Sequence, residues 1–215
     1  ATVLFLSPEY LFKFWNSVKC TVPIMAFQTI VACLAAYGLT RYRSKGREIV
    51  LFVYIILMLM PYQVTLVPNR LVAEWLHIYG TSWAVILPGI FSPFAVFLLT
   101  KSMRRIPTAV VEAARLDGCS EWQIFFKIYL PLCKNIVYSV MILVFIDYWN
   151  MVEQPLTYLA QNADKMPLSV MFNQFSASPT GTEFAGATLY ILPALFVYLY
   201  FQKDILDGIQ LSELK

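Results

Sequence analysis

The stretch that decides the fold is residues 107–131, PTAVVEAARLDGCSEWQIFFKIYLP. It predicts two short helices joined at Gly118, since glycine can end a helix in a left-handed conformation at little steric cost. Pro107 suits the first turn of the first helix, because its missing N–H would have no intrahelical partner there. Ser120 and Gln123 form a Ser-x-x-Gln capping box at the start of the second helix. The stretch is therefore a helix–turn–helix element, and it lies between two apolar, membrane-like segments.

The two predicted helices differ in the surface they offer. Ala113 and Ala114 are strong helix formers that leave a low, flat surface on the first helix. The second helix carries four aromatic residues whose spacing predicts one continuous stripe. They are Trp122, Phe125, Phe126 and Tyr129.

Several residue types in this stretch stand at a fixed spacing. Glu112-Ala113-Ala114 is followed by three residues, Gly118, nine residues and then Ile128-x-Leu130-Pro131. Asp117 completes the form EAAxxDG. This pattern resembles the EAA loop of ABC-importer permeases, the cytoplasmic coupling helix that docks into a cleft on the ATPase subunit. The resemblance implies a coupling loop over residues 105–130, with ATPase-coupling roles for Glu112, Ala113, Ala114, Asp117 and Gly118.

A second interpretation of this stretch remains open. It could be an interfacial amphipathic hairpin that only ties two transmembrane helices together. Such hairpins, however, do not require Ala-Ala and Gly at these spacings.

The composition indicates a membrane protein. Of 215 residues, 59% are hydrophobic and 13% are charged, with a mean hydropathy of +0.64. Soluble domains carry about 25% charged residues, so this chain lacks the polar residues needed to cover its apolar ones. A net charge of +3 is too small to suggest nucleic acid. The predicted fold class is all-α, a polytopic transmembrane helical bundle.

The sequence offers no set of residues for chemistry. The four cysteines (Cys20, Cys33, Cys119 and Cys133) form no CxxC pair, and a single histidine cannot assemble a metal site. There is no phosphate-binding glycine motif, so any ATP must be bound by another subunit. We therefore expect a non-catalytic chain that binds no metal and no cofactor itself.

Five stretches are long enough to span the roughly 30 Å of bilayer hydrocarbon. We place them near residues 16–40, 48–67, 83–103, 131–152 and 185–203. Ten of the 16 basic residues fall in the loops that follow the first and third spans. Because basic loops stay inside, these two loops and the C-terminus are predicted to be cytoplasmic.

This orientation puts residues 1–15 outside, with Asn16 and Ser17 as the expected cap of the first span. Since the chain starts at Ala1 without Met, we expect that a span precedes it, giving six in the full protein. A removed signal sequence is the competing explanation.

Proline and glycine predict breaks in two spans. Pro61 and Pro68 interrupt the second span, and Pro88, Gly89 and Pro93 interrupt the third. The loop at 155–184 is expected to be outside, with a short helix over residues 168–175.

Polar residues near the outer end of the fourth span are candidates for the substrate path. They are Asp147, Tyr148, Trp149 and Asn150, to which we add Gln63 beside the break in the second span. Carboxylates and amides in a membrane usually turn inward and find a partner. Two interpretations stay open: a polar lining suited to a sugar, or an interfacial belt of aromatic residues at a helix end.

Two further stretches, residues 60–68 (MPYQVTLVP) and 87–107 (LPGIFSPFAVFLLTKSMRRIP), resemble the maltose-type branch of carbohydrate permeases. The resemblance implies that residues 1–215 form a single permease domain of an ABC importer for sugars or oligosaccharides. It further implies a bacterial or archaeal inner-membrane location. The implied partners are a second permease subunit, two ATPase subunits that bind ATP and Mg, an extracellular solute-binding protein, and membrane lipid.

The alternative function is an ion-coupled secondary transporter. Such a carrier needs ionisable residues deep within its spans. Asp147 is the only candidate, and it lies near one end of its span.

Overall fold

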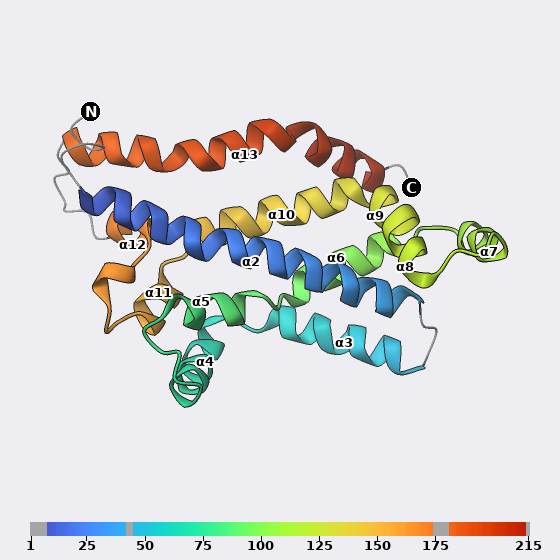
Figure 1. Ribbon diagram of the computed structural model, residues 1–215, viewed down its shortest axis with the longest axis horizontal. Coiled ribbons are helices and arrows are strands. Elements are labelled where there is room, and N and C mark those ends of the chain that lie inside the picture. The colour runs from blue at the N-terminus through green and yellow to red at the C-terminus, as the bar shows by residue number, and fades with distance from the viewer. Residues whose placement is uncertain (1–7, 42–44, 174–180, 214–215) are drawn as a thin grey trace. The chain divides into compact units, whose positions relative to one another are not determined.

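The computed structural model describes residues 8–41, 45–173 and 181–213, and these residues form helices and no strands (Figure 1). The predicted all-α fold class is therefore confirmed. The chain divides into two compact units. Unit 1 comprises residues 1–27, 61–90 and 142–200, and unit 2 comprises residues 28–60, 91–141 and 201–215. Three helices contribute residues to both units: α2 (Pro8–Arg41), α10 (Lys134–Trp149) and α13 (Gly181–Glu213).

The remaining elements lie between these three helices in the sequence. In chain order they are α3 (Lys45–Leu59), α4 (Gln63–Trp75), α5 (Ser82–Gly89), α6 (Pro93–Met103), α7 (Thr108–Leu116), α8 (Glu121–Ile124), the π-helix η1 (Phe125–Tyr129), α9 (Leu130–Leu132), α11 (Glu153–Tyr158), the 3₁₀-helix η2 (Ala163–Lys165) and α12 (Leu168–Asn173). That the whole chain acts as a single permease domain stays a prediction.

The described residues include three helices that are long and apolar enough to cross a membrane. They are Glu9–Arg41, Ser82–Met103 and Phe184–Gln202. Two bent helix pairs also qualify, Gly46–Leu59 with Gln63–Trp75 and Glu121–Leu132 with Lys134–Trp149. Counting each pair as one span gives up to five, which is the number that the sequence predicts.

Two of the predicted breaks are present, around Pro61 and between Gly89 and Pro93, whereas Pro68 lies inside α4 and does not interrupt it. α3 and α4 are separated around Pro61, which has no backbone N–H to continue the helical hydrogen bonds. α5 and α6 are also separated, at residues 90–92, although together they make up the candidate span Ser82–Met103. Ser92 caps α6, because its Oγ accepts a hydrogen bond of 3.3 Å from the Ala95 backbone N–H. Pro93 occupies the first turn, where a missing donor costs nothing.

The predicted start of the first span is wrong. α2 begins at Pro8, so Asn16 and Ser17 lie inside the helix and do not cap it. Their polar groups bind the chain around η2 and α12. Asn16 Nδ2 donates to the Asp164 carbonyl oxygen at 2.6 Å, and Ser17 Oγ accepts from the Leu168 backbone N–H at 2.9 Å. Ser17 is buried, so a tertiary partner satisfies a side chain that local spacing had assigned to a cap.

Unit 1 is built around the stacked indole of Trp149. This ring lies 5.4 Å from that of Phe145 and 5.7 Å from that of Tyr190, both nearly parallel to it, while Phe14 meets it edge-on at 5.7 Å. The Trp149 Nε1–H donates to the Tyr190 carbonyl oxygen at 3.2 Å. The contacts join α2, α10 and α13 into one core.

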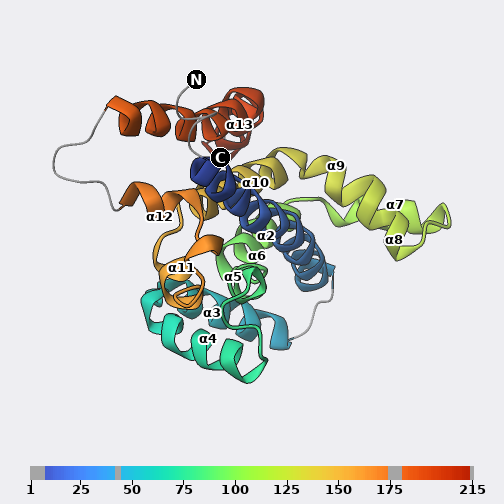
Figure 2. The same ribbon diagram turned by 60° about the vertical axis from the view of Figure 1, so that its left-hand side comes forward.

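The predicted outer loop is mostly short helices in the part that the structure describes (Figure 2). α12 confirms the expected helix as far as Asn173, and the predicted residues 174 and 175 lie outside the described residues. Tyr158 of α11 is buried, and this burial raises the pKa of its phenol above the ordinary value. The phenol therefore packs as part of unit 1.

Gly89 allows α5 to approach α2 closely within unit 1. A Cβ at this position would lie 3.0–3.1 Å from three side-chain atoms of Ile24, which is fully buried. We expect Gly89→Ala to lower the unfolding free energy by about 1–3 kcal/mol through overpacking. Thermal unfolding in detergent, followed by circular dichroism, measures this. Ile24→Ala removes those three atoms. If Gly89→Ala lowered the unfolding free energy equally in that background, the overpacking explanation would be contradicted.

In unit 2, α3 packs against α6. Glu48 in the first turn of α3 binds Arg104 at the end of α6, with 3.0 Å between Oε1 and Nη2. Arg47 binds the same carboxylate at 2.8 Å. The carboxylate therefore joins the start of α3 to the end of α6, after which the chain continues into α7.

Candidate functional site

The coupling stretch begins with α7, a nine-residue helix with two distinct faces. It starts at Thr108, one residue after Pro107, whose φ of −60° and ψ of 135° make it the residue before the helix. Val111 and Ala114 lie three residues apart and are buried. Glu112 and Ala113 are exposed, and Leu116 is 90% exposed. The pair of alanines is thus divided: Ala114 packs inward, and Ala113 keeps the outer surface low.

Gly118 makes the sharp turn between α7 and α8, as the sequence predicts. Its φ is +81°, in the left-handed region, and its N–H donates to the Arg115 carbonyl oxygen at 3.0 Å. Asp117 is the C-cap residue of α7 and is exposed. The predicted capping box is also present, because Ser120 Oγ accepts from the Gln123 N–H at 3.3 Å and Gln123 Oε1 accepts from the Ser120 N–H at 2.8 Å.

The four aromatic residues after the turn do not share one face, so the predicted stripe is wrong in part. Phe125 and Tyr129 are buried against Tyr37 of α2, with ring centroids 5.0 Å apart in both cases. Trp122 and Phe126 point outward and are mostly exposed. The segment is a π-helix, which suits a chain approaching Pro131, because that proline cannot donate to the carbonyl four residues earlier.

At the start of α8, the Glu121 carboxylate binds side chains from two other helices, α2 and α7. Its Oε2 accepts from the Tyr37 hydroxyl at 2.7 Å and from Arg41 Nε at 3.1 Å. Arg115, in the last turn of α7, binds the other oxygen, Oε1. The carboxylate also lies in the first turn of α8, where the helix dipole favours a negative charge. Glu121 therefore connects α7, α8 and the end of α2.

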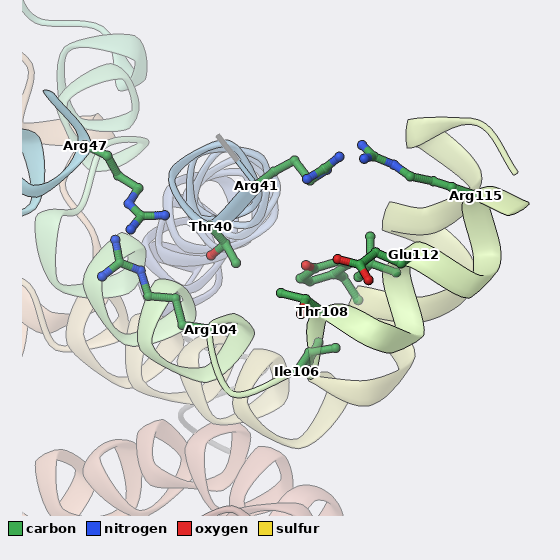
Figure 3. A pocket seen from close by; sticks show the side chains of 10 residues that line it. Thr40, Arg41, Arg47, Arg104, Ile106, Thr108, Glu112 and Arg115 are labelled. Atoms are coloured by element: carbon green, nitrogen blue, oxygen red, sulfur yellow. The ribbon is translucent and has the colours of Figure 1, made fainter. Parts of the chain in front are cut away.

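A cavity of about 600 Å³ lies beside α7 within unit 2 (Figure 3). Four arginines line it, and in Figure 3 Arg47 and Arg104 point toward each other, as do Arg41 and Arg115. Glu112 also lines the cavity.

The charges around this cavity nearly cancel. Arg47 and Arg104 share the Glu48 carboxylate, and Arg41 and Arg115 share Glu121. With Glu112 included, four guanidinium groups face three carboxylates. Among the described residues, Glu112 is in no ion pair.

The substrate-path candidates lie in unit 1 in different environments. Gln63, Asp147 and Asn150 are exposed, and Tyr148 is half-buried with its hydroxyl 3.5 Å from the Gly89 carbonyl oxygen. Asn150 Oδ1 accepts from the Tyr190 hydroxyl at 3.0 Å. Trp149 is buried in the core described above, so the structure gives it a packing role.

Two residues at these sites were missed in the sequence. Leu116 stands on the exposed face of α7, and the signal was an apolar residue out of phase with Val111 and Ala114. Tyr62 is exposed directly before Gln63, so it joins the candidate substrate-path residues.

Comparison with known proteins agrees with this geometry. The family model described as "Binding-protein-dependent transport system inner membrane component" matches residues 28–206. The lactose transport system permease protein LacG of Rhizobium radiobacter is 34% identical, over 91% of this chain and 72% of its own length. The arabinooligosaccharides transport system permease protein AraQ of Bacillus subtilis is 31% identical, over 100% and 77% respectively.

A solved structure has the same fold. A chain in the crystal structure of a bacterial ABC transporter involved in the import of the acidic polysaccharide alginate superposes with a TM-score of 0.80. The match covers 94% of this chain and 76% of that chain at 23% sequence identity, so it shows the fold alone. Together, the family match and the two permease relatives confirm the resemblance first seen in residues 112–131. The chain belongs to the family of inner membrane components of binding-protein-dependent transport systems, the permeases of ABC importers.

Proposed function

We propose that this permease imports a sugar or oligosaccharide and relays the motion of a separate ATPase through residues 112–118. The observation that carries this proposal is the exposed face of α7. It presents the Glu112 carboxylate, which makes no ion pair with the described residues, and one turn further on the 90%-exposed Leu116, with the small Ala113 beside them. A charged group and an apolar side chain next to a low, flat surface suit a cleft on another protein.

The relay follows from the way α7 is held. α6 leads into α7, and α8, η1 and α9 lead into α10, so α7 is connected by short segments to two candidate spans. When ATP closes the ATPase dimer, α7 moves with the cleft as a rigid body. Gly118 keeps the return angle of the chain fixed, and the adjoining spans carry the displacement into the membrane.

The proposed assembly contains several further chains. Family members work with ATPase and binding-protein partners, and this chain would pair with a second, different permease subunit above two ATPase subunits. ATP and Mg would be bound by the ATPase subunits, and this chain would perform no catalysis. An extracellular solute-binding protein would meet the surface formed by residues 155–184.

The solute class rests on the relatives and on the polar residues of unit 1. The permeases LacG and AraQ are named for lactose and arabinooligosaccharides. Gln63, Asp147 and Asn150 expose amide and carboxylate groups, and Tyr62 and Tyr148 are their neighbours in the chain. Such groups hydrogen-bond the hydroxyls of a sugar, while the aromatic faces cover its apolar side.

Uptake measurements test the solute. The complete importer would be reconstituted in proteoliposomes with its solute-binding protein and ATP. It would be offered radiolabelled lactose and arabinotriose, with a radiolabelled amino acid for comparison. We expect ATP-dependent uptake of one of the saccharides. Uptake of the amino acid alone would overturn the assignment to sugars, and uptake that follows an ion gradient without ATP would overturn ATP coupling.

The native Cys119 tests the proposed cytoplasmic position of the coupling loop. It is partly exposed beside Gly118, whereas Cys20, Cys33 and Cys133 are buried. In cells expressing the permease subunits without the ATPase, we expect a membrane-impermeant maleimide to label Cys119 in inside-out vesicles and not in intact cells. Cys119→Ala should remove the label. Labelling in intact cells would place the loop outside and contradict the proposal.

A further inference from the structure

The end of α2 is bound to the coupling stretch at one point. Tyr37 and Arg41 are four residues apart, so they project from the same face of α2. Both donate to the Glu121 carboxylate, at 2.7 Å from the tyrosine hydroxyl and 3.1 Å from the arginine Nε. A second guanidinium nitrogen, Arg41 Nη2, lies 3.4 Å from the other carboxylate oxygen. The contact is therefore forked and directional.

Aromatic packing supports this contact from behind. The Tyr37 ring contacts those of Phe125 and Tyr129, which follow Glu121 in the chain and are both buried. A single exposed ion pair is usually weak. Here a forked ion pair, a charge-assisted hydrogen bond and two ring contacts hold the same two segments together, which fixes their geometry.

The contact has a special place in the connectivity. α7 is joined by the chain itself to α6 on one side and, through α8, to α10 on the other. α2 has no such connection, because residues 42–107 separate it from α7 in the sequence. Glu121 also binds Arg115, which lies in the last turn of α7. A displacement of α7 therefore reaches the end of α2 through this carboxylate.

We propose that Glu121 is a positioning residue that makes α2 a third relay of the ATPase stroke, besides the spans on either side of the coupling loop. The inference rests on the proposed function, because it requires that α7 is driven by an ATPase. Glu121 acts through Tyr37 and Arg41. It needs no contact with the solute or with ATP.

The experiment measures import per ATP hydrolysed by the complete importer in proteoliposomes. The probe is radiolabelled lactose, or arabinotriose if the uptake measurement selects it. Two variants break the contact from opposite sides: Glu121→Gln, and the double variant Tyr37→Phe/Arg41→Gln. We expect both to lower import per ATP about fivefold, which corresponds to about 1 kcal/mol of lost coupling. The amount of assembled complex and its maximal ATPase rate should stay at the wild-type level.

Glu74→Gln is a matched control. Glu74 accepts from Arg70 Nε at 2.9 Å, and its side chain is 42% exposed against 43% for Glu121. That pair lies within one helix, so its loss should leave import per ATP unchanged. A role in folding alone would instead reduce the amount of complex and the ATPase rate together with import.

The outcomes separate this inference from the proposed function. Wild-type import per ATP in both contact-breaking variants overturns the inference, and so does loss of assembly in both. The coupling variant Glu112→Lys serves as the reference. If it uncouples transport while the Glu121 variants do not, only the relay through α2 fails. If Glu112→Lys also transports normally, the proposed coupling role of α7 fails.

Discussion

Replacing Gly118 by valine is expected to lower ATP-driven uptake at least about tenfold while the subunit still inserts into the membrane. Gly118 has a φ of +81°, and a Cβ built there meets no atom within 4 Å. The penalty therefore comes from the backbone alone. A left-handed conformation costs an ordinary residue about 1–2 kcal/mol, and a β-branched side chain costs more. Since 1.4 kcal/mol is a factor of ten, the turn should open and misplace α7. Uptake into vesicles containing equal amounts of the subunit measures this.

Two variants serve as controls for this prediction. Asparagine tolerates the left-handed conformation, so Gly118→Asn should keep most of the uptake. Gly38 lies within α2, and a Cβ there also meets no atom within 4 Å. Gly38→Val should therefore leave uptake close to wild type. Equal uptake by Gly118→Val and Gly38→Val would contradict the role of the turn.

Reversing the charge at Glu112 is expected to have the largest effect on ATPase binding. Glu112 is exposed, and within the described part of the chain it has no ion pair. If it meets a basic group in the ATPase cleft, Glu112→Lys leaves two like charges in contact. Breaking a buried interfacial ion pair costs about 2–5 kcal/mol. We expect the affinity of the permease for the ATPase to fall about 30-fold or more, with uptake lost in parallel.

The comparison variants make this measurement specific. Glu112→Gln removes the charge without adding repulsion, so its loss of affinity should be smaller than that of Glu112→Lys. Glu74→Lys reverses a charge on α4 that lies outside the coupling stretch. It should bind the ATPase as the wild type does. If the ATPase bound Glu112→Lys with unchanged affinity, Glu112 would not be part of the docking surface.

Much of the coupling stretch could be predicted because its features are local. A positive φ at Gly118 follows from the residue type, and the capping box between Ser120 and Gln123 follows from their spacing. The break at Pro61 follows from a missing backbone donor. Each of these three features depends on atoms within a few residues of one another, so the sequence alone contains the information needed to predict it.

The predictions are wrong where residues distant in the chain, or an irregular helix, decide the outcome. Asn16 and Ser17 have the residue types of a helix cap, yet they bind the chain around residues 164–168 from the middle of α2. The predicted aromatic stripe assumes α-helical spacing, but the π-helix before Pro131 changes which rings point inward. From the sequence, Trp149 could belong to an interfacial aromatic belt or to a sugar site. Its ring contacts with Phe14 and Tyr190 instead make it a core residue.

The sequence by itself determined that this chain is an all-α membrane permease with an EAA-type turn, because hydropathy, proline positions and motif spacing are properties of the linear order. Only the tertiary structure decided which face of α7 is exposed, that Glu121 binds the end of α2, and that Trp149 is buried. These outcomes depend on side chains meeting across large separations in the chain, where packing and charge pairing choose among conformations that are locally equivalent.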